Sequence, residues 1–101
     1  AGPSAQPRFL KAAVLLQNDR WGELETLASD WSRAEPDDAE AWYLLGAALA
    51  QQDRLPQARI ALECSLSLEP ALAAARTRLA DVVQRGAPAP ASPKPCLSDR
   101  P

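Results

Sequence analysis

Apolar residues recur at helical spacing in two runs between residues 39 and 70, with a polar break between the runs at residues 51–54. The first run has apolar or small residues at i, i+3, i+4 and i+7, which is one face of a helix: Trp42, Leu45, Gly46 and Leu49. The second run repeats this rhythm with Leu55, Ala58, Leu62 and either Ser65 or Leu66. The pattern predicts two antiparallel helices joined by a short turn.

Local signals place the ends of these two helices. Asp37 or Asp38 can cap the first helix, and Glu40 stands where it would complete a capping box with Asp37. Pro56 suits the first turn of the second helix, where its missing N–H needs no partner. Pro70 ends that helix, because the residue before a proline is disfavoured in the α conformation.

The small residues Gly46 and Ala58 predict where the two helices cross. Small side chains let the backbones approach closely, and the larger Trp42, Leu49 and Leu62 would fill the space around that contact. A single hairpin cannot bury its own apolar face, so we expect neighbouring helices.

The chain before and after this hairpin repeats it at an offset of 34 residues. Towards the N-terminus, eight residues are identical to the residues 34 positions later, and the alignment needs no gap. The pairs are Leu10/Leu44, Ala13/Ala47, Leu15/Leu49, Gln17/Gln51, Asp19/Asp53, Arg20/Arg54, Glu35/Glu69 and Pro36/Pro70. Going forward, half a unit keeps the register of the first helix with Ala73, Ala75, Leu79, Ala80 and Val83. Gly86 then stops this helix, and the proline-rich residues 87–101 predict a disordered tail.

The central hairpin resembles a tetratricopeptide (TPR) repeat, whose pattern is W-x2-L-G-x2-Y, then A-x3-F, then P. Matching residues are Trp42, Leu45, Gly46, Ala58 and Pro70, while Leu49 and Leu62 stand at the Tyr and Phe positions. The resemblance implies an all-α fold of two TPR hairpins and a capping helix in a short right-handed superhelix. Its units would be an N-terminal extension or vector remnant (1–6), a degenerate first repeat (7–38), a second repeat (39–72), a capping helix (73–86) and the tail (87–101).

Composition and charge argue against some classes of partner. A net charge of −2 disfavours nucleic acid and anionic membrane surfaces, both of which select basic proteins. No run approaches the ~20 apolar residues that a membrane-spanning helix needs, so no membrane insertion is expected. The absence of methionine indicates that the chain was cut from a longer polypeptide or a precursor, and the alanine-rich and arginine-rich composition suggests a bacterial gene.

The residues that catalysis needs are scarce. The chain contains no histidine, and therefore lacks the usual general base and a common metal ligand. No glycine-rich phosphate loop follows a strand, and the acidic pair Asp37-Asp38 is explained by the start of a helix. We predict no catalytic, cofactor-binding or metal-binding residues, and expect that the protein is not an enzyme.

The cysteines and tryptophans are interpreted as structural. Cys64 lies late in a helix and Cys96 lies in the tail, so they could pair only if the tail folded back. We interpret Cys64 as a semi-buried thiol and Cys96 as an exposed one, which slightly favours a reducing, cytoplasmic compartment. Trp21 and Trp42 occupy core positions, and for Trp31 a core position is preferred over a partner contact.

In the TPR family, the first helices of successive repeats line a concave groove that binds extended or helical peptides. The positions that the resemblance carries over are Phe9, Ala13 and Leu16, then Tyr43, Ala47 and Ala50, and finally Thr77, Arg78, Asp81 and Gln84. The first two trios are apolar and each faces one way, which predicts an exposed patch for a partner. The alternative for Phe9 and Leu16 is that they cover the core.

The resemblance implies a protein–protein interaction module, a scaffold or adaptor, that binds a protein or peptide partner as a monomer or weak homodimer. The groove would be centred on Tyr43, with Arg78 and Arg85 meeting an acidic flank of the ligand. The clamp that some TPR domains use for chaperone carboxylates is not expected, since Arg78 alone matches it. Two alternatives stay open: a self-assembly element of a longer array, and an accessory domain of an enzyme elsewhere on the parent chain.

Overall fold

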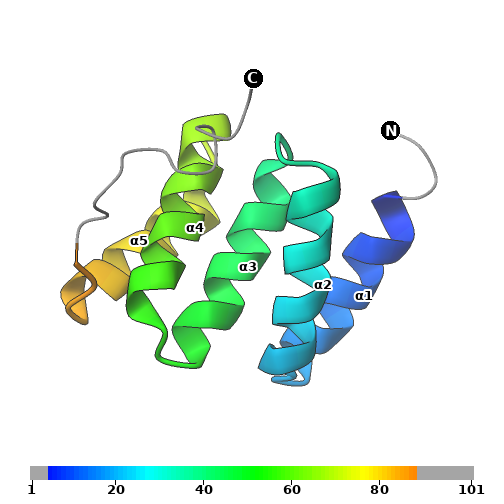
Figure 1. Cartoon of the computed structure of the whole chain (residues 1–101), viewed down its shortest axis with the longest axis horizontal. Helices are drawn as coiled ribbons and strands as arrows, with labels where there is room; N and C mark the ends of the chain where they lie inside the picture. Colours follow the sequence, from blue (N-terminus) through cyan, green and yellow to red (C-terminus); the bar gives the residue numbers. More distant parts are fainter. Residues whose placement is uncertain (1–4, 89–101) are drawn as a thin grey trace.

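The computed structural model describes residues 5–88, with side chains described from residue 9 onward. It contains five helices in this part of the chain: α1 (Ala5–Gln17), α2 (Trp21–Ala34), α3 (Ala39–Gln51), α4 (Leu55–Leu68) and α5 (Ala73–Gln84). No strand occurs within residues 5–88, so the predicted all-α fold class is confirmed. In Figure 1 the helices follow one another from α1 on the right to α5 on the left, and each packs against the next.

The crossing of α3 and α4 lies at the two small residues that the sequence singled out. Gly46 and Ala58 are both buried. A Cβ atom built on Gly46 would lie 2.6 Å from Leu62 Cγ and 3.3 Å from the Ala58 carbonyl oxygen. Glycine therefore permits the close approach of these two helices, as predicted.

Two hydrophobic clusters form the core. The first joins α1, α2 and α3 through Ala12, Leu15, Leu24, Ala28, Trp31, Ala41, Leu44 and Ala48. The second joins α3, α4 and α5, with Ala87, through Leu49, Ala50, Ala58, Ala61, Leu62, Ala75 and Val82. The partly buried Tyr43 and Leu45 pack against both clusters. Helices α2 and α4 thus each lie between two other helices, and α3 belongs to both halves of the core.

The backbone of the two hairpin turns repeats at the same 34-residue offset as the sequence. Each turn contains an aspartate in the left-handed conformation, Asp19 with φ 57° and Asp53 with φ 61°. The residue after each aspartate donates its N–H to the carbonyl five residues earlier: Arg20 to Leu15 at 2.9 Å, and Arg54 to Leu49 at 3.0 Å. This pairing satisfies carbonyls at the helix end, as in a Schellman motif.

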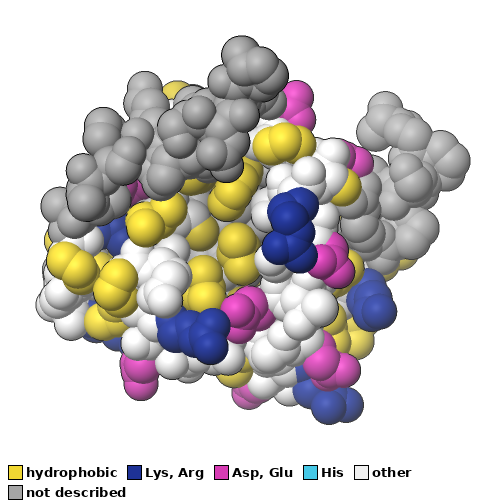
Figure 2. All heavy atoms as spheres, in the orientation of Figure 1, with side chains coloured by type: hydrophobic (Ala, Val, Ile, Leu, Met, Phe, Trp, Pro, Cys, Tyr) yellow, Lys and Arg dark blue, Asp and Glu magenta, His cyan; other side chains and the backbone are white. Residues whose placement is uncertain are grey.

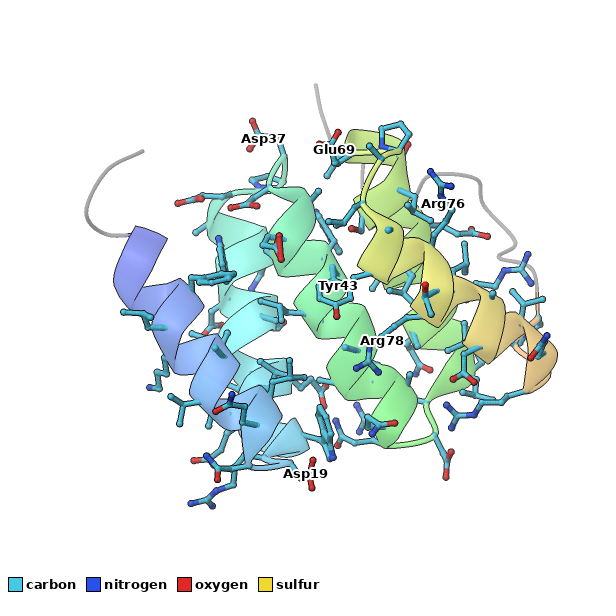
Figure 3. The ribbon with its side chains drawn as sticks, turned by 180° about the vertical axis from the view of Figure 1, so that it is seen from behind. Asp19, Asp37, Tyr43, Glu69, Arg76 and Arg78 are labelled. Carbon is cyan, nitrogen blue, oxygen red and sulfur yellow. The ribbon has the colours of Figure 1, made fainter. Side chains whose placement is uncertain are left out.

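The start of α3 is capped by Asp38. Its Oδ1 accepts a hydrogen bond from the Glu40 backbone N–H at 3.0 Å, and its Oδ2 accepts one from Trp31 Nε1 at 3.1 Å. The predicted capping box with Asp37 is wrong, because Asp37 is exposed and points away from the helix in Figure 3. Trp31 is 3% exposed, so its core position is confirmed. Burial raises the pKa of Glu40 above its ordinary value, and the neighbouring Asp38 carboxylate raises this pKa further.

The segment after α5 departs from the predicted tail. Gly86 ends the helix with φ 105°, as expected, but Ala87 is only 6% exposed and packs in the second cluster. Its carbonyl accepts a hydrogen bond from Arg59 Nη1 at 3.0 Å. The prediction that the disordered tail starts at residue 87 is therefore wrong. Residues 89–101, the rest of the predicted tail, lie outside the described part of the chain.

Cys64 is not the free thiol that we expected. It is fully buried in α4 and takes part in a disulfide bond. The chain has two cysteines, and Cys96 lies outside the described residues. Disulfides form in oxidising compartments, so Cys64 gives no reason to favour a reducing one.

Candidate functional site

The predicted groove residues come from α1, α3 and α5. Figure 3 shows α1 and α5 on either side of α3, with Tyr43 on α3 and Arg78 below it reaching in from α5. The opposite side, seen in Figure 2, mixes apolar side chains with charged side chains of both signs. Ion pairs within the described residues include Arg54–Glu25 at 3.1 Å and Arg59–Glu63 at 3.0 Å.

An open pocket of about 480 Å³ lies between α3 and α5. Its lining residues are Tyr43, Ala74, Thr77, Arg78 and Asp81. Four of the predicted groove residues therefore meet in one place, although Tyr43 on α3 precedes the three α5 residues by 34 or more positions in the chain. Ala74 was missed, yet its spacing of i, i+3, i+4 and i+7 from the three α5 residues places it on the same helix face.

Arg78 is the cation that this pocket offers to a ligand. It is partly buried, and within residues 5–88 no hydrogen bond or ion pair engages its guanidinium. The neighbouring carboxylate of Asp81 is already bound, because it accepts a hydrogen bond from Arg85 Nη1 at 3.1 Å. Within residues 5–88, the ion pair of Asp81 is with Arg85, and none joins Asp81 to Arg78.

Arg85 does not take the ligand-facing role that we expected. Its Nη2 lies 2.7 Å from Asp53 Oδ1 and 3.1 Å from the Ala50 carbonyl oxygen. The hydrogen bond to Asp81 is the main cause that raises the pKa of Arg85, with Asp53 contributing in the same direction. This side chain ties the end of α5 to the turn after α3.

Two residues of the predicted groove present no surface to a partner. Ala47 is 0% exposed and Ala50 is 2% exposed, and Ala50 belongs to the second cluster. The interpretation of these two alanines as exposed groove residues is therefore wrong. Of the α3 trio, Tyr43 is the residue that reaches the pocket.

The α1 residues of the predicted groove do not join the Tyr43 pocket. Leu16 is partly buried and packs against the first cluster, and Ala13 is also partly buried. Phe9 is 50% exposed. Covering the core is therefore the better interpretation of Leu16, whereas Phe9 presents its ring to solvent.

A second pocket, of about 660 Å³, is surrounded by carboxylates near the starts of α3 and α5. Its acidic residues are Glu35, Asp37, Asp38, Glu40 and Glu69. Within residues 5–88 no group of three or more acidic, cysteine or histidine side chains is placed to hold a metal ion. Asp38 is engaged as a helix cap, so we explain this acidity by helix starts rather than by a ligand.

None of the helices in the described residues has the length and apolar character required to cross a membrane. The sequence matches no protein-family model and no curated protein.

Proposed function

We propose that the chain is a TPR-type protein-interaction module, and that its pocket between α3 and α5 binds a peptide or helix carrying an acidic side chain. The observation that carries this proposal is Arg78, a partly buried cation without an ion pair among the described residues, beside Tyr43 in an open pocket. The TPR assignment and its right-handed superhelix are parts of the proposal. They are supported by the tight crossing at Gly46 and by the repeated geometry of the two turns.

The chemistry of the pocket suits a carboxylate next to an apolar group. The guanidinium of Arg78 offers a planar set of donors that matches a carboxylate with two parallel hydrogen bonds. Tyr43 adds apolar ring area and a hydroxyl, and Tyr and Arg are enriched among residues that dominate binding energy. Because Arg78 is partly buried, its attraction to a carboxylate is screened less than that of a fully exposed charge.

The size of the surface sets the expected strength of binding. The pocket is small and open, and one side chain with its neighbours can fill it. Interfaces below about 1,200 Å² are typical of weak and transient complexes. We therefore expect modest affinity for a single copy, which several copies in a parent assembly would raise.

The test is selection of peptides from a random displayed library on the 101-residue chain. Enriched peptides should carry Asp or Glu next to an apolar residue. A synthetic peptide from this set should lose more than ~1 kcal/mol of binding energy when Arg78→Glu or Tyr43→Ala is introduced. Arg33→Glu is the matched control, because Arg33 is an exposed cation that pairs with Asp30 away from this pocket.

Circular dichroism separates binding from folding, since Tyr43 also packs against both clusters. If Tyr43→Ala unfolds the chain, peptide binding by Tyr43→Phe and by Arg78→Glu is compared with binding by the wild type instead. Enriched peptides without acidic residues would contradict the proposal. Equal binding by wild type and Arg78→Glu would contradict it as well.

A further inference from the structure

The pocket between α3 and α5 contains a carboxylate as well as a cation. Asp81 lines this pocket one helical turn after Arg78, three residues further along α5. The Asp81 side chain is 58% exposed, so a ligand in the pocket can reach it. The pocket therefore presents two opposite charges, which are offset by roughly 4.5 Å along the axis of α5.

Arg85 holds the Asp81 carboxylate in place. Asp81 Oδ2 accepts a hydrogen bond from Arg85 Nη1 at 3.1 Å. Arg85 is itself fixed through its Nη2, which donates to Asp53 Oδ1 at 2.7 Å and to the Ala50 carbonyl oxygen at 3.1 Å. No described residue donates a hydrogen bond to Asp81 Oδ1. Asp81 thus offers a ligand one carboxylate oxygen whose position the protein already restrains.

The charges around Arg85 leave this end of the pocket negative. Arg85 forms ion pairs with two carboxylates, Asp53 and Asp81, and one guanidinium cannot neutralise both. Arg78, by contrast, has no ion pair within residues 5–88. The charge that the pocket presents therefore changes sign along α5, from positive at Arg78 to negative at Asp81. A ligand flank at this end should be basic, whereas the sequence had led us to expect an acidic flank beside Arg85.

The other end of the pocket is apolar. Ala74 lies one turn before Arg78, just as Asp81 lies one turn after it. Tyr43 lies above Arg78 in Figure 3, toward the start of α5, and adds the area of its ring. The order of surfaces along the pocket is therefore apolar, positive and negative.

We propose that the ligand of this pocket is a helix with an apolar, an acidic and a basic side chain in a row on one face, the acidic one in the middle. The inference rests on the proposed function, because the acidic side chain is the one that Arg78 binds. The basic side chain pairs with Asp81, which makes Asp81 a specificity-determining residue. Steps of three or four residues keep all three side chains on one helix face.

This order does not depend on the direction of the ligand helix. With the acidic side chain in the middle, a ligand that runs parallel or antiparallel to α5 meets Arg78 in either case. A ligand with its basic side chain in the middle would bring two cations together, and like charges at an interface reject a partner. The pocket should therefore select the order of charges in addition to their presence.

The probes are three synthetic alanine-rich peptides, each held helical by a side-chain staple on the face away from the pocket. The first carries leucine, then glutamate four residues later and lysine three residues after that, the spacing of Ala74, Arg78 and Asp81. The second exchanges the glutamate and the lysine, and the third replaces the lysine with glutamine. In fluorescence anisotropy, the first should bind the 101-residue chain about three- to fivefold more tightly than the third, the gain expected from an exposed ion pair. The second should bind more weakly than the third.

Asp81→Asn tests whether Asp81 is the residue that recognises the lysine. This variant keeps an oxygen for the hydrogen bond from Arg85 and removes the negative charge, so the first and third peptides should bind it equally well. Asp53→Asn is the matched control, because Asp53 also pairs with Arg85 but does not line the pocket. Asparagine tolerates the left-handed backbone at this position, where φ is 61°, and the lysine should keep its advantage in this variant. If Asp81→Asn does not fold, the comparison of the three peptides on the wild type decides.

A displayed random library covers the case in which the synthetic peptides bind too weakly. Peptides selected on the wild type should carry Lys or Arg one helical turn from the acidic residue, on the side away from the apolar residue. Peptides selected on Asp81→Asn should keep the acidic residue and lose this preference for a basic one.

The outcomes separate this inference from the proposed function. Equal binding of the first and second peptides, with both weakened by Arg78→Glu, would overturn the order of charges and leave the proposed function intact. An advantage of lysine that persists in Asp81→Asn would overturn the role of Asp81. Binding that is unchanged in Arg78→Glu, or no binding of any synthetic or displayed peptide, would overturn both the inference and the proposed function.

Discussion

Gly46 lies where α3 crosses α4, and its missing Cβ sets how closely these helices pack. A Cβ there would lie 2.6 Å and 2.8 Å from two carbons of Leu62. Gly46→Leu should lower the free energy of unfolding by roughly 1–3 kcal/mol or more, because overpacking forces backbone and rotamer shifts. Urea unfolding followed by circular dichroism measures the effect.

Gly22 provides the control for that experiment. It lies in α2, and an added Cβ would meet nothing within 4 Å. Gly22→Ala should therefore stabilise the chain by about 0.5–1 kcal/mol through helix propensity. An unchanged unfolding midpoint for Gly46→Leu would contradict the close packing of α3 against α4 at Gly46. It would also take away the main support for the TPR assignment.

Asp38 combines two roles in one carboxylate, since it caps α3 and accepts the Trp31 indole N–H. Asp38→Ala should cost about 1–2 kcal/mol of stability, because it removes a helix cap and leaves the buried indole donor without this acceptor. Asp37→Ala is the matched control at the exposed neighbouring position. Equal melting temperatures for the two variants would contradict the capping assignment.

Glu40 makes stability depend on pH in a direction that its pKa fixes. Its pKa in the folded chain is raised by burial and by Asp38, so folding favours the protonated form. Protonated Glu40 therefore contributes to the stability of the folded chain. This contribution is fully present below the unfolded pKa of about 4.3 and is lost as pH rises through the raised pKa of the folded chain. Glu40→Gln should therefore stabilise the chain at neutral pH and have less effect in acid.

Thermal melts at several pH values measure this difference. Glu69→Gln is the control, because Glu69 is exposed near the same pocket. A Glu40→Gln effect that stays constant from acid to neutral pH would contradict the inferred linkage.

The structural roles of some of these residues could be predicted from the sequence, and the roles of others could not. Helical spacing selects Gly46 and Ala58, because small residues on two facing helices mark a crossing. The choice between Asp37 and Asp38 depends on the indole of Trp31, whose position is tertiary. The burial of Ala47 likewise depends on neighbouring helices, because periodicity identifies a helix face but not what covers that face.

At the scale of elements, α5 is held by more than its apolar face. Arg85 joins α5 to the turn after α3 through Asp53 and the Ala50 carbonyl. Arg85→Ala should speed amide hydrogen exchange in α5 relative to α2. Arg33→Ala removes an ion pair between two exposed side chains within α2 and should leave exchange in α5 unchanged. Equal exchange in the two variants would mean that apolar packing alone holds α5.

The helices themselves were predictable because their signals are local, and the attachment of α5 was not. The pair Asp81–Arg85 has helical i, i+4 spacing and can be read from the sequence. Its further partner Asp53 lies 32 residues away in a turn. The buried Ala87 escaped prediction for a similar reason, since proline content indicates disorder while packing depends on the neighbouring helices.

At the scale of the whole molecule, the 34-residue offset predicted which helices correspond but not which of their faces would be covered. Leu10 and Leu44 are equivalent in sequence, yet Leu10 is exposed and Leu44 is buried. The difference comes from position in the array, because α3 has a helix before it and α1 has none within residues 5–88.

Tyr43 belongs to the pocket and also packs against both hydrophobic clusters. A ligand that restrains this side chain acts on the contact through which the two halves of the core meet. Anything that binds the native state and not the unfolded chain raises the apparent stability of the native state, by about 2.7 kcal/mol at one hundred times its dissociation constant. Occupancy of this one small pocket should therefore reinforce both halves of the array together.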